Sequence, residues 1–404
     1  MSTQNVSFAA IGDLSFHDGA SLARLAAVAA DLAAADIAFG QLEGPLSAEG
    51  TYQRSPGAYR PENDAPSPDQ AATALAASGI DVVGIAGAHT LDRSREGLAA
   101  TRAVLESQNL TPIGAGPDAA VARAPYTVTV NGLTVAVLAY SSFVQRRNEA
   151  TSPRTTPDRG GNTNARPGIA PMRALTLYTQ LDWQAGTAAR VITIPDEADL
   201  KAVEADVRAA KETADVVVVS FRWGMPQGDV GAIADYQYEV GRRAVDAGAS
   251  LVFGHGSSLV QAIELYRGAT ICYGIGGFSF RPRGEDDPLP DHRPTPDTRW
   301  TAVLRAELTA EGAKVALLPY AFGADGIPHP VTEGSPEFAE YHAFLQRSSV
   351  APSTAKNAWE IHYLPVVENS LALRYTGYVG TNASFEPIAL PEMIADPILA
   401  HRGH

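Results

Sequence analysis

Polar side chains that could do chemistry follow six of the apolar segments in this chain. The carboxyl ends of parallel strands meet at one edge of an α/β sheet, and ligands bind beyond that edge. We therefore expect the following residues to converge there: Asp13, Gln41, Glu43, His89, Asp92, Ser141, Ser142, Arg222, Trp223, His255, Ser257 and Ser258. Carboxylates and imidazoles can bind a metal ion or transfer protons, and an arginine can bind an anionic group.

One of these segments, LVFGHGSSLVQAIELY, ends an apolar strand with a histidine and two serines before a predicted helix. GHGSSL is not the G-x-S-x-G turn that presents a nucleophilic serine. We interpret Ser257 and Ser258 as caps of that helix or as ligands of an anionic group at its N-terminus. Further candidate contacts lie elsewhere: His17, which follows Asp13, and Asn162, Asn164 and Arg166 in a polar loop.

Alternating strand and helix patterns must position these residues. Strands are predicted over 6–12, 36–43, 80–87, 215–224, 250–256 and 269–280, and helices over 20–35, 67–79, 92–109, 196–214, 236–248 and 336–348. Asn131-Gly132 predicts a hairpin within 126–142, and residues 300–322 predict two strands around Glu311-Gly312. The order predicts an α/β domain over 1–325 with a long loop insertion at 143–175, followed by a C-terminal extension over 326–404 that packs on the core.

The composition excludes several classes of function. The 404 residues carry a net charge of −14, which argues against nucleic acid and, more weakly, against an anionic membrane as a partner. The single cysteine, Cys272, rules out an internal disulfide and a cysteine-based zinc site. Because the first residues lack a signal-peptide pattern and no run is long enough to span a membrane, we expect a cytoplasmic protein.

Six segments in order, over roughly residues 6–320, resemble the CapA family. They are IGDLSF, DIAFGQLEGPLS, GIDVVGIAGAHTLDRSREG, VAVLAYSS, ADVVVVSFRWG and DAGASLVFGHGSSLV. This family is associated with bacterial capsule and poly-γ-glutamate synthesis and is related to calcineurin-like metallophosphoesterases. The resemblance implies a four-layer α/β/β/α sandwich with its site at the carboxyl edge of the sheets.

The chain departs from the family pattern at four motifs. The pattern has Asn-Leu-Glu at Gln41-Leu42-Glu43, Asn-Asn-His-Thr at Gly87-Ala88-His89-Thr90, His-Trp-Gly at Arg222-Trp223-Gly224, and Gly-His-His-Pro-His at Gly254-His255-Gly256-Ser257-Ser258. An arginine cannot coordinate a cation, because its guanidinium carries a fixed positive charge. We therefore expect the two-metal site of such hydrolases to be lost, with one weakly held cation on Asp13, Glu43 and His89 as an alternative.

The resulting hypothesis is a bacterial, metal-independent enzyme without a cofactor, acting on a small organic or natural-product substrate that has an anionic or enolisable group. The reaction would be an elimination, conjugate addition or cyclisation, as in a lyase or cyclase. Two alternatives remain open. One is a metal-dependent hydrolase of phosphate esters or amides with altered ligands. The other is a non-catalytic accessory protein of poly-γ-glutamate or polysaccharide assembly. The sequence also leaves a homodimer open.

The predicted roles under this hypothesis are as follows. The catalytic residues are Asp13, Glu43, His89, Arg222 and His255: the carboxylates and His89 transfer protons, and Arg222 stabilises developing negative charge. The substrate-binding residues are His17, Gln41, Asp92, Asn162, Asn164, Arg166, Trp223, Ser257 and Ser258. Asp92 either orients the His89 imidazole or caps the helix that follows.

Overall fold

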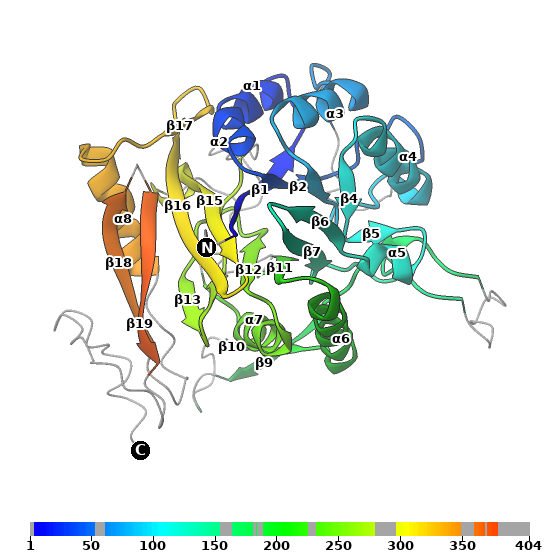
Figure 1. Cartoon of the computed structure of the whole chain (residues 1–404). Helices are drawn as coiled ribbons and strands as arrows, with labels where there is room; N and C mark the ends of the chain where they lie inside the picture. The colour runs from blue at the N-terminus through cyan, green and yellow to red at the C-terminus, as the bar shows by residue number, and fades with distance from the viewer. Residues whose placement is uncertain are drawn as a thin grey trace.

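The computed structural model describes residues 4–52, 61–153, 164–180, 183, 189–224, 232–278, 296–348, 359–367 and 370–378. Two large β-sheets face each other (Figure 1). The first has the strand order β18 (Trp359–Val367), β19 (Ser370–Tyr378), β16 (Gly312–Phe322), β15 (Trp300–Thr309), β1 (Val6–Ser15), β2 (Ile37–Glu43), β3 (Val82–Gly84) and β4 (Thr111–Ile113), with β17 (Pro328–Pro330) beside β16. The second has the order β13 (Ile263–Tyr266), β14 (Ala269–Cys272), β12 (Leu251–His255), β11 (Val216–Arg222), β7 (Leu133–Ser141) and β6 (Tyr126–Val130).

Helices cover the outer face of each sheet (Figure 1). The first sheet carries α1 (Ser21–Ala26), α2 (Ala29–Ala33), α3 (Pro68–Ala77) and α4 (Ser94–Ser107), and the second carries α6 (Glu197–Thr213) and α7 (Asp235–Ala247), with the short α5 (Ala119–Arg123) nearby. One apolar core lies between the sheets and includes Phe8 and Phe253. Two more lie under the helices, around Leu75 and Leu200. The predicted four-layer α/β/β/α sandwich is confirmed.

Local sequence explains why several elements begin or turn where they do. Ser67 and Gln70 form a reciprocal capping box at the start of α3, and Pro68 occupies its first turn. Asp196 caps α6 by accepting hydrogen bonds from two backbone N–H groups. Asn131 and Gly132 both have positive φ, as the predicted hairpin between β6 and β7 requires.

Three predicted elements differ in the structure. The single helix expected over 20–35 is divided into α1 and α2. The helix expected to begin at Ser257 and Ser258 is absent from residues 259–266, because Ser258 has φ +58° and the chain then turns into the edge strand β13. The predicted loop 143–175 contains β8 (Gly168–Ile169) and the start of β9 (Ala174–Gln180), which pairs with β10 (Ala189–Pro195).

The C-terminal segment also contributes to the sandwich. Helix α8 (Pro336–Ser348) has the predicted bounds and places Tyr341, Phe344 and Leu345 in the core between the sheets. Strand β19 pairs with β16. The domain boundary at 325 stays a prediction. No helix in the described part of the chain is both long and apolar enough to span a membrane.

Candidate functional site

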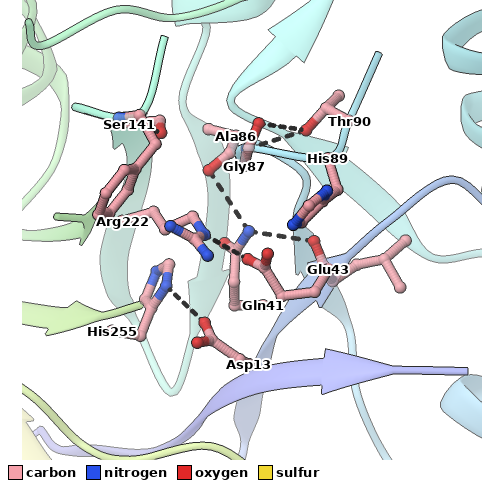
Figure 2. Close-up of polar contacts among 12 residues, drawn as sticks. Asp13, Gln41, Glu43, Ala86, Gly87, His89, Thr90, Ser141, Arg222 and His255 are labelled. Atoms are coloured by element: carbon pink, nitrogen blue, oxygen red, sulfur yellow. Dashed lines mark hydrogen bonds and ion pairs between the residues drawn. The ribbon is translucent and has the colours of Figure 1, made fainter. Parts of the chain in front are cut away.

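Four charged or titratable side chains meet where β1, β2, β11 and β12 end (Figure 2). Arg222 donates a hydrogen bond from Nε to Glu43 Oε1 at 2.5 Å. Nδ1 of His255 lies 3.1 Å from Asp13 Oδ1. All four residues are buried. The strand ends of both sheets therefore converge as expected for an open α/β architecture.

The strand register brings these residues together. In the second sheet Arg222 is paired with His255 on one side and with Ser141 on the other. In the first sheet Asp13 is paired with Gln41, and a bulge between Ile11 and Asp13 shifts this register. The contact between Glu43 and Arg222 crosses from one sheet to the other, so it ties the two halves of the sandwich at this edge.

The guanidinium of Arg222 is held from several directions. Its Cζ lies 4.5 Å from the centre of the Phe143 ring, within the range of a cation–π contact. Burial disfavours its charged form, but the carboxylates of Glu43 and Asp13 outweigh that effect, so the pKa of Arg222 is raised. The side chain therefore carries a permanent positive charge inside the cluster.

Two glycines leave room for this ion pair. A Cβ at Gly256 would lie 3.2 Å from both Cγ and Nη1 of Arg222. A Cβ at Gly87 would lie 3.3 Å from Oε1 of Glu43. Larger residues at these positions would crowd the side chains that form the pair.

His89 and Asp92 form a second pair beside this cluster. Nδ1 of His89 lies 2.7 Å from Oδ2 of Asp92, and Asp92 is buried while the His89 side chain is 31% exposed. Helix α4 begins at Ser94 and receives no side-chain cap. Of the two roles left open for Asp92, orientation of the imidazole is the one that this geometry fits.

Gln41 is paired with Asp13 in the first sheet and is fully buried. Its Nε2 donates to the carbonyl oxygens of Leu42 and Ala86 at 3.2 and 3.4 Å. Its Oε1 has no hydrogen-bond partner within the described residues. Gly84 packs directly against this amide, since a Cβ there would lie 2.4 Å from Oε1.

The structure does not bring every predicted residue into this cluster. Trp223 belongs to the core, where it stacks on Phe221 and donates from Nε1 to the Tyr273 carbonyl at 2.8 Å. His17 contacts Ser15 and Asp18.

The predicted serine and loop residues also have structural partners or lie elsewhere. Ser257 exchanges hydrogen bonds with the backbone of Leu259, and Ser258 lies in the turn rather than at a helix start. Arg166 pairs with Glu149, and Asn164 is exposed. Asn162 lies outside the described residues.

Sequence reasoning missed two residues that contact the cluster. Ser220 Oγ lies 3.0 Å from Nε2 of His255, and Phe143 covers Arg222. Ser220 precedes Arg222 by two positions on one strand, so the alternation of side chains places both on the same face and could have identified it. Phe143 lies just after a strand and carries no comparable signal.

The residues present do not fit a two-metal centre. In the described part of the chain, one group of side chains could supply metal ligands: Asp13, Glu43 and His255, with ligand atoms within 4.8 Å of one another. Two divalent cations that lie about 3.5–4 Å from each other need more ligands than these three side chains. They also need a site that no positively charged side chain occupies. Here the permanent charge of Arg222 already contacts one of the carboxylates.

Residues 7–282 match a protein family described as bacterial capsule synthesis protein PGA_cap. A probable polyglutamine synthesis accessory protein of Mycobacterium tuberculosis is 30% identical over 60% of this chain and 55% of its own length. The PGA biosynthesis protein CapA of Bacillus subtilis is 27% identical over 61% of this chain and 54% of its own length. The chain thus matches about half the length of these curated relatives.

Solved structures with similarity to this chain include two nucleotidases. The NAD nucleotidase of Haemophilus influenzae has a TM-score of 0.39 and 12% identity, and the match covers 86% of this chain and 57% of that one. A 5'-nucleotidase precursor from Thermus thermophilus has a TM-score of 0.40 and 13% identity, with 85% and 58% covered.

Proposed function

The chain belongs to the bacterial capsule synthesis protein family, and we propose on that basis that it is a non-catalytic accessory protein in the assembly of poly-γ-glutamate or of a capsular polysaccharide. The observation that carries this proposal is the family match itself. It spans residues 7–282 and so contains every strand-end residue of the cluster. The names of the relatives, an accessory protein of polyglutamine synthesis and a PGA biosynthesis protein, support the same role.

The hypothesis of a lyase or cyclase that modifies natural products is wrong. It rested on the argument that a chain with a degraded metal site keeps acid–base chemistry. The curated relatives are instead named for accessory and biosynthetic roles in polymer assembly, which points away from a tailoring enzyme. The presence of carboxylates and histidines at the strand ends suggested catalysis, but such residues also occur in ion pairs that are purely structural.

The geometry of the cluster supports a non-catalytic role. Both carboxylates that could accept a proton from a substrate already contact a cation or an imidazole, Glu43 with Arg222 and Asp13 with His255. Both pairs are buried. Protonation of Glu43 would leave the guanidinium of Arg222 uncompensated in the interior, which is costly. The cluster is therefore better suited to holding the sheets together than to turnover.

Deletion of the gene in the bacterium that carries it tests this proposal. We expect the deletion strain to lose glutamate polymer or capsular polysaccharide, measured as glutamate and sugar after hydrolysis of the cell-surface fraction. Wild-type protein should restore the polymer. Unchanged polymer in the deletion strain would contradict the accessory role.

A second complementation separates accessory from catalytic function. The double variant Glu43→Gln/Arg222→Met removes both charges of the buried pair at similar volume. His89→Ala removes the half-buried imidazole. If the role is non-catalytic, each variant should restore polymer to the wild-type level when its soluble amount matches. Loss of polymer with either variant, at equal soluble protein, would contradict a purely structural role for these side chains.

A further inference from the structure

The strand-end cluster contains side chains that could bind a metal cation, and it also contains the positively charged side chain of Arg222. Asp13, Glu43 and His255 offer ligand atoms within 4.8 Å of one another. The guanidinium of Arg222 contacts the carboxylate of Glu43 at 2.5 Å, and both side chains are about nine-tenths buried or more. With a neutral imidazole, the two carboxylates and the guanidinium sum to a net charge of −1. Without the guanidinium the same volume would hold two uncompensated carboxylates.

The tautomer of His255 decides whether the nitrogen that faces Asp13 can act as a ligand. A carboxylate only accepts hydrogen bonds, so Nδ1, at 3.1 Å from Asp13, carries the proton. Nε2 then accepts from the hydroxyl of Ser220 at 3.0 Å. The nitrogen that faces Asp13 therefore has no lone pair for a metal. A serine hydroxyl can also accept, so Ser220 would equally support the opposite tautomer, in which Nδ1 is free to coordinate.

The residues around Arg222 leave space for its guanidinium and contact it. Gly256, with φ +107°, leaves the space that Nη1 and Cγ of Arg222 approach. Phe143 covers the other side of the guanidinium. Gly87 leaves room at the carboxylate of Glu43. The neighbouring residues therefore provide both space and a cation–π contact for the guanidinium.

We propose that Arg222 stands in for a divalent cation at this cluster, and that its replacement by a neutral ligand opens a divalent-cation site on Asp13, Glu43 and His255. In the native chain the guanidinium supplies the positive charge and closes the site to metal. In Arg222→His the charge is gone, His255 can adopt the other tautomer, and the new imidazole adds a fourth ligand. Three carboxylate or imidazole ligands with a fourth position are a sufficient set for zinc or manganese.

The experiment compares metal uptake by three full-length proteins: wild type, Arg222→His and Arg242→His. Arg242 is the matched control, because it is also an arginine paired with an acidic residue, Glu264, at 2.8 Å. In the described part of the chain, Glu264 does not belong to a group of three or more side chains that could bind a metal ion. Each protein is stripped with EDTA, titrated with ZnCl2 and with MnCl2 by calorimetry, and analysed for bound metal after gel filtration.

We expect about one ion per chain for Arg222→His and no stoichiometric uptake by wild type or Arg242→His. Stoichiometric metal in the wild-type protein would overturn the proposal. So would a folded Arg222→His that takes up no more metal than Arg242→His. If Arg222→His does not fold, Arg222→Gln is titrated in its place, and the wild-type measurement alone still decides whether the native site is closed. The polymer assay is not involved, so this test fails or succeeds independently of the proposed function.

Discussion

Residues that do no chemistry decide how the strand-end cluster is built. Arg222 needs the empty space at Gly256 and the ring of Phe143, and Glu43 needs the space at Gly87. From the sequence we predicted that Asp13, Glu43, Arg222 and His255 would converge, because each follows a strand of an α/β pattern. The contacts of Glu43 with Arg222 and of Asp13 with His255 were not predictable in the same way. They join residues of different sheets, and such contacts depend on how the sheets pack rather than on sequence spacing.

Substitution of Gly256 tests the fit around Arg222. Gly256→Ala would place a methyl group 3.1 Å from the Trp223 carbonyl oxygen and 3.2 Å from the Arg222 side chain, and would strain a residue with φ +107°. Gly268 is the matched control, since it has φ +86° and a Cβ added there would meet no atom within 4 Å. We expect Gly256→Ala to lower the free energy of unfolding by about 1–3 kcal/mol more than Gly268→Ala, measured by denaturant titration. Equal effects would contradict the close packing of Arg222 and the Trp223 carbonyl around Gly256.

The single cysteine provides a probe of the core. Cys272 is fully buried in β14, and burial raises the pKa of its thiol to about 12. Since the thiolate is the reactive form, the native protein should not react with a thiol-specific reagent at pH 8. Addition of denaturant should release one reactive thiol per chain, read by absorbance. Rapid reaction of the native protein would contradict the burial of this strand.

At the scale of elements, helix α1 is fastened to the strand-end region by a buried ion pair. Arg24 donates from Nη1 and Nη2 to both carboxylate oxygens of Asp18, at 2.8 and 3.0 Å. Burial alone would raise the pKa of Asp18, but the hydrogen bonds and charge of Arg24 outweigh it, so the pKa is lowered. The same guanidinium donates from Nε to the Gly326 carbonyl, which links α1 to the turn before β17.

This pair predicts a defined pH dependence of stability. Because the folded-state pKa of Asp18 lies below its unfolded value, the stabilisation is complete above about pH 4 and is lost as the pH falls through the folded-state pKa. Asp18→Asn should remove this dependence and lower the free energy of unfolding at pH 7 by about 3–5 kcal/mol, because Arg24 stays buried without its partner. Asp246→Asn, at the exposed pair with Arg267, should cost less than about 1 kcal/mol. Similar costs for both variants would contradict the account of Asp18.

The β9–β10 hairpin differs from the rest of the sandwich because it exposes apolar side chains. Leu175, Leu177, Tyr178, Val191 and Ile194 are each more than 40% exposed. Leu177→Ser should therefore change the free energy of unfolding by no more than about 0.5 kcal/mol, whereas Leu200→Ala in the core should cost about 2–5 kcal/mol. A large and concentration-dependent cost of Leu177→Ser would instead show that this face is covered in an assembly.

Elements with strong local signals were predictable from the sequence, and elements that depend on tertiary contacts were not. Ser67 with Gln70, Asp196 and Asn131-Gly132 mark boundaries that the structure reproduces. The segment after Ser258 has a helical apolar pattern, but its residues pair with β14 as an edge strand. Only Ala174 and Leu175 of the β9–β10 pair fall within the predicted loop 143–175, and no element was predicted for its remaining residues.

At the scale of the whole molecule, the sandwich brings two sheets together so that their strand ends share one cluster. The pair between Glu43 and Arg222 joins residues 179 positions apart and crosses the interface between the sheets. Family membership and this architecture are the parts of the account that the sequence could predict. The role of the protein was not predictable in this way, because substitutions at ligand positions, such as Arg222, alter what a shared architecture can do without altering its fold.

The most direct test of the central claim, that Arg222 takes the place of a metal ion at the strand ends, is anomalous X-ray diffraction from wild-type crystals soaked in MnCl2. The account predicts no anomalous peak among Asp13, Glu43 and His255, and electron density for Arg222 Nε within hydrogen-bond distance of Glu43. A manganese peak about 2.0–2.6 Å from those side chains, with Arg222 turned away, would contradict it.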